Sequence, residues 1–89
     1  MDNLKEQTMS IEEVIITTKR FLVEEFEVDE KSIIPNASLK DTLDLDSLDY
    51  VDLVVLIDAN FGFKVEQLDF VGMVSFQDFY DFIFKKVNN

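Results

Sequence analysis

The sequence predicts an all-α fold: a bundle with three long helices, one short helix and a long loop between the first and second helices. Apolar residues recur at helical spacing in three separate stretches of the 89-residue chain, and a helix-start signal precedes each stretch. One proline and two glycines leave little of the punctuation that an all-β fold requires. With 47% hydrophobic residues, the chain can form a packed core. We therefore expect one domain over residues 10–89, preceded by a flexible tail over residues 1–9.

The first long helix is predicted over residues 11–26. Ser10 and Glu13 have the spacing of a capping box, in which each side chain bonds the other's backbone N–H. The apolar face that follows consists of Ile11, Val14, Ile15, Thr18, Leu22 and Phe26. Residues 28–42 include Pro35 and lack sustained periodicity, so they are expected to form the long loop, anchored by Ile33, Ile34 and Leu39.

The remaining helices follow from similar signals. Asp46 is expected to cap a second long helix that ends at Phe61, because Gly62 is a typical stop. Residues 66–70 are expected to form one short helical turn. Ser75 and Asp78 resemble a second capping box, which begins a last helix whose apolar face consists of Phe76, Phe79, Tyr80, Ile83 and Val87.

Composition excludes several classes of function. The chain has no cysteine and no histidine, which removes disulfides, thiolate nucleophiles, zinc sites and the commonest general base. The net charge of −11 argues against binding to nucleic acid or to an anionic membrane and suits partners with basic patches. No apolar run is long enough to span a membrane and no signal peptide precedes the first helix, so a monomeric cytoplasmic protein is expected.

The most informative segment is Asp44-Leu45-Asp46-Ser47-Leu48-Asp49, which places a serine at a helix start. Ser47 is either a simple helix cap or a residue that another enzyme modifies. It is not a catalytic nucleophile, because no histidine, lysine or cysteine lies nearby to activate it. Free backbone N–H groups and the helix dipole would favour an incoming phosphate here. An EF-hand is excluded, because Leu48 and Asp49 occupy a ligand position and the required glycine position, and no metal site is expected.

The helix after Ser47 carries two apolar rows. Tyr50, Leu53, Val54, Ile57 and Phe61 form a stripe suited to docking on a core. Leu48, Val51 and Val55 form a second row, which is either buried too or exposed for partner proteins. Residues 41–63 contain six aspartates and no lysine or arginine, which favours the exposed docking face.

These residues resemble the acyl carrier protein family over residues 11–87. Asp46-Ser47-Leu48-Asp49 is similar to the family's D-S-L-D signature. The other matching segments are Val28, Ile33, Asn36-Ala37-Ser38-Leu39, Asp52-Leu53-Val54, Phe61 and Tyr80-Asp81-Phe82-Ile83. The resemblance implies a four-helix acyl-carrier bundle that is not itself an enzyme.

The resemblance also implies a cofactor and partners. A phosphopantetheinyl transferase, which binds magnesium, would move 4'-phosphopantetheine from coenzyme A to Ser47, and the arm's thiol would then carry acyl groups as thioesters. Acyl-loading, condensing and tailoring enzymes with basic patches would dock on Asp46, Leu48, Asp49, Val51, Asp52, Val55 and Asp58. The acyl chain would enter a pocket formed by Leu39, Val54, Ile57, Met73 and Phe79.

The chain departs from the family pattern at several positions. Asp44 replaces a usual glycine, Leu45 a common alanine, Ala59 a glutamate on the docking helix and Glu66 a proline. Phe79 stands where a small residue is typical, so either the pocket is short or closed, or Phe79 merely strengthens a small core. These differences point to a specialised carrier, for instance for a polyketide or aryl-polyene product, rather than to housekeeping fatty acid synthesis. The alternatives are a peptidyl or aminoacyl carrier and a helical interaction module without an arm.

Overall fold

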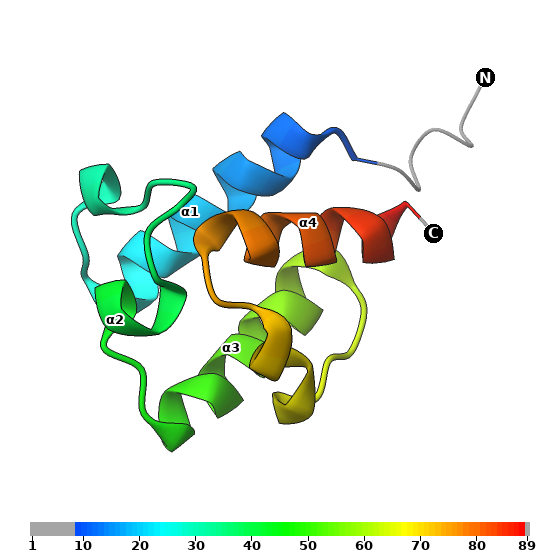
Figure 1. Cartoon of the computed structure of the whole chain (residues 1–89). Helices are drawn as coiled ribbons and strands as arrows, with labels where there is room; N and C mark the ends of the chain where they lie inside the picture. The colour runs from blue at the N-terminus through cyan, green and yellow to red at the C-terminus, as the bar shows by residue number, and fades with distance from the viewer. Residues whose placement is uncertain (1–8, 89) are drawn as a thin grey trace.

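The structure, a computed structural model, describes residues 9–88 and is a helical bundle (Figure 1). Its long helices are α1 (Ile11–Phe26), α3 (Ser47–Phe61) and α4 (Phe76–Val87). The shorter elements are α2 (Leu39–Leu43) and the 3₁₀-helices η2 (Glu30–Ser32) and η3 (Gln67–Gly72). No strand occurs in the described range, so the predicted all-α class and its three long helices are confirmed. Residues 1–8 of the predicted tail lie outside this range.

The helix boundaries follow from the predicted capping signals. The Ser10 hydroxyl accepts from the Glu13 N–H at 3.1 Å, and the Glu13 carboxylate accepts from the Ser10 N–H at 2.8 Å. Ser75 and Asp78 form the same reciprocal pair at the start of α4. Bonds from the Ser75 and Val74 N–H groups hold the pKa of the Asp78 carboxyl below its usual value. The side chains of the first turn therefore satisfy N–H groups that the helix itself leaves free.

The segment predicted as an unbroken loop has more structure than expected. It contains η2 and the five-residue helix α2, whose N-cap Ser38 accepts from the Asp41 N–H at 3.1 Å. Five residues are too few for a periodicity signal, which explains the omission. Of the predicted anchors, Ile33 and Leu39 are buried, but Ile34 is half exposed and does not anchor the loop.

The loop is fixed to the start of α4. The Leu39 N–H donates to the Val74 carbonyl at 2.8 Å, the Phe76 N–H to Ala37 at 3.2 Å and the Gln77 N–H to Pro35 at 2.9 Å. At the other end of α4, the Asn88 side chain accepts a hydrogen bond from the Met9 N–H and donates one to the Met9 carbonyl. Met9, the last residue of the predicted flexible tail, is therefore bonded to the bundle. Both ends of α4 are therefore connected to segments far away in the sequence.

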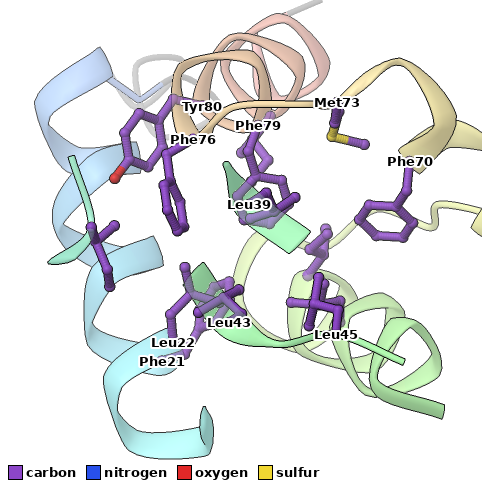
Figure 2. Close-up of a cluster of buried hydrophobic side chains, with 14 of the residues drawn as sticks. Phe21, Leu22, Leu39, Leu43, Leu45, Phe70, Met73, Phe76, Phe79 and Tyr80 are labelled. Carbon is purple, nitrogen blue, oxygen red and sulfur yellow. The ribbon is translucent and has the colours of Figure 1, made fainter. Parts of the chain in front are cut away.

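Phenylalanines connect the elements through the core, part of which is drawn in Figure 2. Tyr50 of α3, Phe70 of η3 and Phe79 of α4 form a row of tilted rings, with neighbouring centroids 5.3 and 6.4 Å apart. A second series joins all three long helices through Phe21, Phe61, Phe63 and Phe82, with centroids 6.2–6.4 Å apart. Such aromatic pairs add stabilisation beyond the burial of their area. Packing of this kind accounts for six of the nine phenylalanines.

Two hydroxyl groups are buried in this core without a hydrogen-bond partner among residues 9–88. They belong to Thr18 on α1 and Tyr80 on α4. In Figure 2 the Tyr80 hydroxyl points away from the body of α4, towards the α1 side of the core. Burial disfavours the charged phenolate and raises the pKa of Tyr80 to about 12.

Tyr80→Phe should therefore stabilise the protein by about 1 kcal/mol, because it removes a buried hydroxyl that has no partner.

The variant should also change how the free energy of unfolding responds to alkaline pH. An unfolded phenol ionises near pH ~10. The folded protein keeps the proton up to about pH 12. Wild-type stability should fall across this interval, as the unfolded state loses the proton first. Chemical denaturation at neutral pH and across this interval measures both effects. Tyr50→Phe is the control and should keep the alkaline fall; an equal fall in Tyr80→Phe would contradict the assignment.

Candidate attachment site

Ser47 is the first residue of α3 and is exposed. The chain reaches it from α2 through a tight connection in which Leu43 and Leu45 are buried and Asp44 and Asp46 are exposed. This alternation fixes the connection to the core and leaves Ser47 at the surface.

Asp46, rather than Ser47, caps the helix. Its carboxylate accepts from the Leu48 N–H at 3.0 Å and from the Asp49 N–H at 3.1 Å. The Asp49 carboxylate accepts in return from the Asp46 N–H at 3.0 Å. Within residues 9–88 the Ser47 hydroxyl makes no hydrogen bond. The interpretation of Ser47 as a simple cap is therefore wrong, and its hydroxyl is free to react.

The same cap corrects the expectation that backbone N–H groups here would receive a phosphate. The amides of Leu48 and Asp49 are already bonded to Asp46. Two carboxylates also neutralise the positive end of the helix dipole. A phosphate approaching Ser47 therefore gains little from this helix, and its charge has to be neutralised from outside the chain.

The two apolar rows of α3 face opposite environments. Leu53 and Ile57 are fully buried, and Tyr50, Val54 and Phe61 are partly buried against the core, as predicted for the inner stripe. The second row is exposed along its length and consists of Leu48, Val51 and Val55. A deeply buried α3 is thus excluded.

The predicted docking aspartates differ in their surroundings. Asp46 and Asp49 belong to the cap, and Asp52 is exposed. Asp58 forms a 2.8 Å ion pair with Lys64. The hydrogen bond to the Asp58 carboxylate also raises the pKa of Lys64. Sequence reasoning missed this pair, because Lys64 lies just beyond the acidic stretch and is brought back by the left-handed turn at Gly62.

The side chains predicted to line an acyl pocket mostly lie in the core. Leu39, Ile57, Met73 and Phe79 are buried. Figure 2 shows Leu39, Met73 and Phe79 in one cluster with Phe70. Val54 is the exception. It is half buried and lines a surface groove of about 510 Å³ with Val55, Asp58, Ala59, Lys64 and Val65.

Two further features concern metals and membranes. Within the described range, no three His, Cys, Asp or Glu side chains converge in a way that could hold a metal ion. Among the helices of residues 9–88, none combines the length and the apolar character that crossing a membrane requires.

Asp44 occupies an unusual conformation three residues before Ser47. Its φ of 54° lies in the left-handed region, which suits glycine best. Asp44→Gly should therefore stabilise the protein by about 0.5–1 kcal/mol. Urea denaturation measures this, and the matched control Asp41→Gly removes the same charge from the regular turn of α2. That control should destabilise by about 1 kcal/mol. Equal effects of the two variants would show that charge, not conformation, matters.

Comparison with known proteins places this geometry in a family. A family model for the phosphopantetheine attachment site matches residues 19–83, which include Ser47. An acyl carrier protein of Thermotoga maritima is 37% identical over 78 residues, which make up 88% of this chain and 96% of that protein. An acyl carrier protein of Thermosynechococcus vestitus is 30% identical over 79 residues, or 89% and 98% of the two chains. These relatives favour an acyl carrier over the two alternatives, a peptidyl carrier and an interaction module. The chain belongs to the acyl carrier protein family and is a carrier with a covalently attached phosphopantetheine, not an enzyme.

Proposed function

We propose that Ser47 is the residue to which phosphopantetheine is attached. The supporting observation is the state of the five serine hydroxyls. Those of Ser10, Ser38 and Ser75 accept bonds from backbone N–H groups as helix caps. The hydroxyl of Ser47 is exposed and has no such role, because Asp46 caps α3 in its place. An exposed hydroxyl without a structural role fits a covalent arm, since modification breaks no hydrogen bond of the fold. The Ser32 hydroxyl is also exposed and makes no hydrogen bond among residues 9–88, but Ser32 ends η2 and lies outside the acidic segment.

The chain supplies the nucleophile but no base for the attachment step. Ser47 Oγ forms a bond to the phosphorus that bears the pantetheine in coenzyme A. The bond from that phosphorus to the bridging oxygen breaks, and adenosine 3',5'-bisphosphate leaves. The transferase would accept the hydroxyl proton, because the carboxylates that flank Ser47 in the sequence, Asp46 and Asp49, are held in the cap. The N-terminus of α3 does not neutralise the charge of the phosphate, so the magnesium ion of the transferase would do so. Once attached, the arm provides a thiol that forms thioesters with acyl groups.

The exposed row of α3 and its free carboxylates are proposed as the docking face for the enzymes that act on the arm. Leu48, Val51 and Val55 present apolar surface beside Asp52. Partners would be cytoplasmic enzymes that load, condense or tailor acyl groups, and the carrier would act as a monomer. Asp58 contributes less, because Lys64 competes with a partner's cations for it.

The attachment residue can be tested by mass. After incubation with coenzyme A and a broad-specificity phosphopantetheinyl transferase, the wild type should gain the mass of one phosphopantetheine. Ser47→Ala should gain none and should keep its helical circular dichroism, because its hydroxyl bonds nothing in the fold. Ser32→Ala is the matched control and should be modified like the wild type. Modification of Ser47→Ala would assign the arm to another residue.

The docking face can be tested by charge reversal. Asp52 is the cleanest position, since Asp49 also caps the helix. Asp52→Lys should reduce the kcat/KM of arm transfer far more than Glu24→Lys on α1, although both change the net charge equally. The difference should shrink at high salt, because exposed charges are screened beyond about 8–10 Å at ~0.1–0.15 M ionic strength. Equal losses at all salt concentrations would argue against a localised face.

The acyl pocket is proposed to be closed by Phe79. Its side chain is 0% exposed and lies 6.4 Å from Phe70 between ring centroids, so it occupies the position where a small residue would leave room for an acyl chain. A closed interior supports a specialised carrier, of polyketide or related products, over a carrier of long fatty acyl chains.

Phe79→Ala tests this closure. Truncation should destabilise the unacylated protein by about 3–5 kcal/mol, through lost burial and the cavity that remains. A long acyl chain on the Ser47 arm should then restore much of this loss by filling the cavity, while it stabilises the wild type little. Thermal unfolding of both proteins, with and without the chain, is the measurement. Strong stabilisation of the wild type by the chain would show that Phe79 leaves the pocket open.

A further inference from the structure

The 3₁₀-helix η3 exposes two large aliphatic side chains. Leu68 and Val71 are each 76% exposed, more than any residue of the apolar row on α3. They are three residues apart, and a 3₁₀-helix has 3.0 residues per turn, so their side chains project in the same direction. We call these two residues the η3 ridge. Scattered exposed aliphatic residues are ordinary, but an aligned pair on one short element forms an apolar contact surface.

The fold does not use the η3 ridge. The element is held by its other residues: Phe70 is buried and stacks on Tyr50 at 5.3 Å. The Glu66 N–H donates to the Asp69 carboxylate at 2.9 Å, and the Met73 N–H donates to the Phe70 carbonyl at 3.0 Å. Polar residues at positions 68 and 71 would preserve all of these contacts.

The η3 ridge belongs to the element that touches the proposed attachment residue. The side chain of Gln67, next to Leu68, donates from Nε2 to the Ser47 carbonyl oxygen at 3.4 Å. In Figure 1, η3 lies in the yellow-to-gold segment between α3 and α4. A protein that brings a reacting phosphorus within bonding distance of Ser47 Oγ has to approach this element.

Charge restricts the chemistry of such a protein. Residues 65–84 contain Glu66, Asp69, Asp78 and Asp81 and no lysine or arginine. Glu66 and Asp69 lie on either side of Leu68 in the sequence. A complementary surface is therefore an apolar depression with basic groups at its edge.

We propose that the η3 ridge is a contact surface for the phosphopantetheinyl transferase, which covers Leu68 and Val71 with such a depression while it modifies Ser47. This inference rests on the proposed role of Ser47. The transferase is the partner that the geometry favours, because its chemistry takes place at Ser47 Oγ itself. Enzymes that act on the acyl group reach the far end of a long arm and need not approach η3.

The test uses the full chain, coenzyme A and a broad-specificity transferase. The double variant Leu68→Ser/Val71→Ser should raise KM about tenfold and leave kcat nearly unchanged. It removes a contact that stabilises the bound ground state and the transition state equally. Ile16→Ser, which truncates an aliphatic side chain on α1 that is 62% exposed, is the matched control and should leave KM unchanged. Circular dichroism should show all variants folded.

Val71→Glu separates apolar contact from charge steering. It adds an acid to η3, the element that contacts Ser47 through Gln67, so a transferase that senses charge alone would react faster, whereas one that covers the η3 ridge should react more slowly. Unchanged KM in the double variant, or faster modification of Val71→Glu, would overturn the inference. A concentration-dependent dimer that the double variant dissociates, with KM unchanged, would assign the η3 ridge to a second copy and also overturn it. No modification of the wild type would instead contradict the proposed role of Ser47.

Discussion

The pairing of the long connection with the start of α4 is the constraint on which the rest of the structure depends. Three backbone hydrogen bonds, from Leu39, Phe76 and Gln77, join residues 35–39 to residues 74–77. They satisfy backbone groups that a free loop would leave to water. They also place Leu39 in the core next to Phe79, which sets where α2 begins. Because α2 leads directly to Ser47, the position of the Ser47 hydroxyl depends on contacts with residues about 30 positions later in the sequence.

The cap of α3 connects this framework to the chemistry. In the other capped α-helices the hydroxyl that precedes the helix receives the backbone N–H, as Ser10 and Ser75 do. At α3 an aspartate performs that role and the serine moves one position into the helix, where its hydroxyl has no structural task. The exchange gives a helix start as firm as the others together with an exposed hydroxyl. It also occupies the N–H groups of Leu48 and Asp49, so under the proposed role of Ser47 the transferase would supply the groups that neutralise the phosphate.

Much of this could be predicted from the sequence, because capping boxes and apolar periodicity are local signals. The starts of α1, α3 and α4 and the buried stripe of α3 follow from them. Contacts that depend on tertiary folding had no such signal. Lys64 reaches Asp58 across the turn at Gly62, and Gln67 reaches the Ser47 carbonyl across 20 residues. The 3₁₀ geometry that aligns Leu68 with Val71 has a period that a search for α-helical spacing does not detect.

Several acidic residues of this chain, whose net charge is −11, have a structural role at helix starts. Asp46, Asp49, Asp69 and Asp78 accept backbone N–H groups at helix starts, where hydrogen bonds and helix dipoles favour negative charge. These four carboxylates thus have hydrogen-bond partners within the fold. Asp52 has no such compensation among residues 9–88, so its field extends into solvent. Attraction of a basic partner to this face therefore depends on Asp52, which no helix cap engages and which follows Val51 of the exposed apolar row.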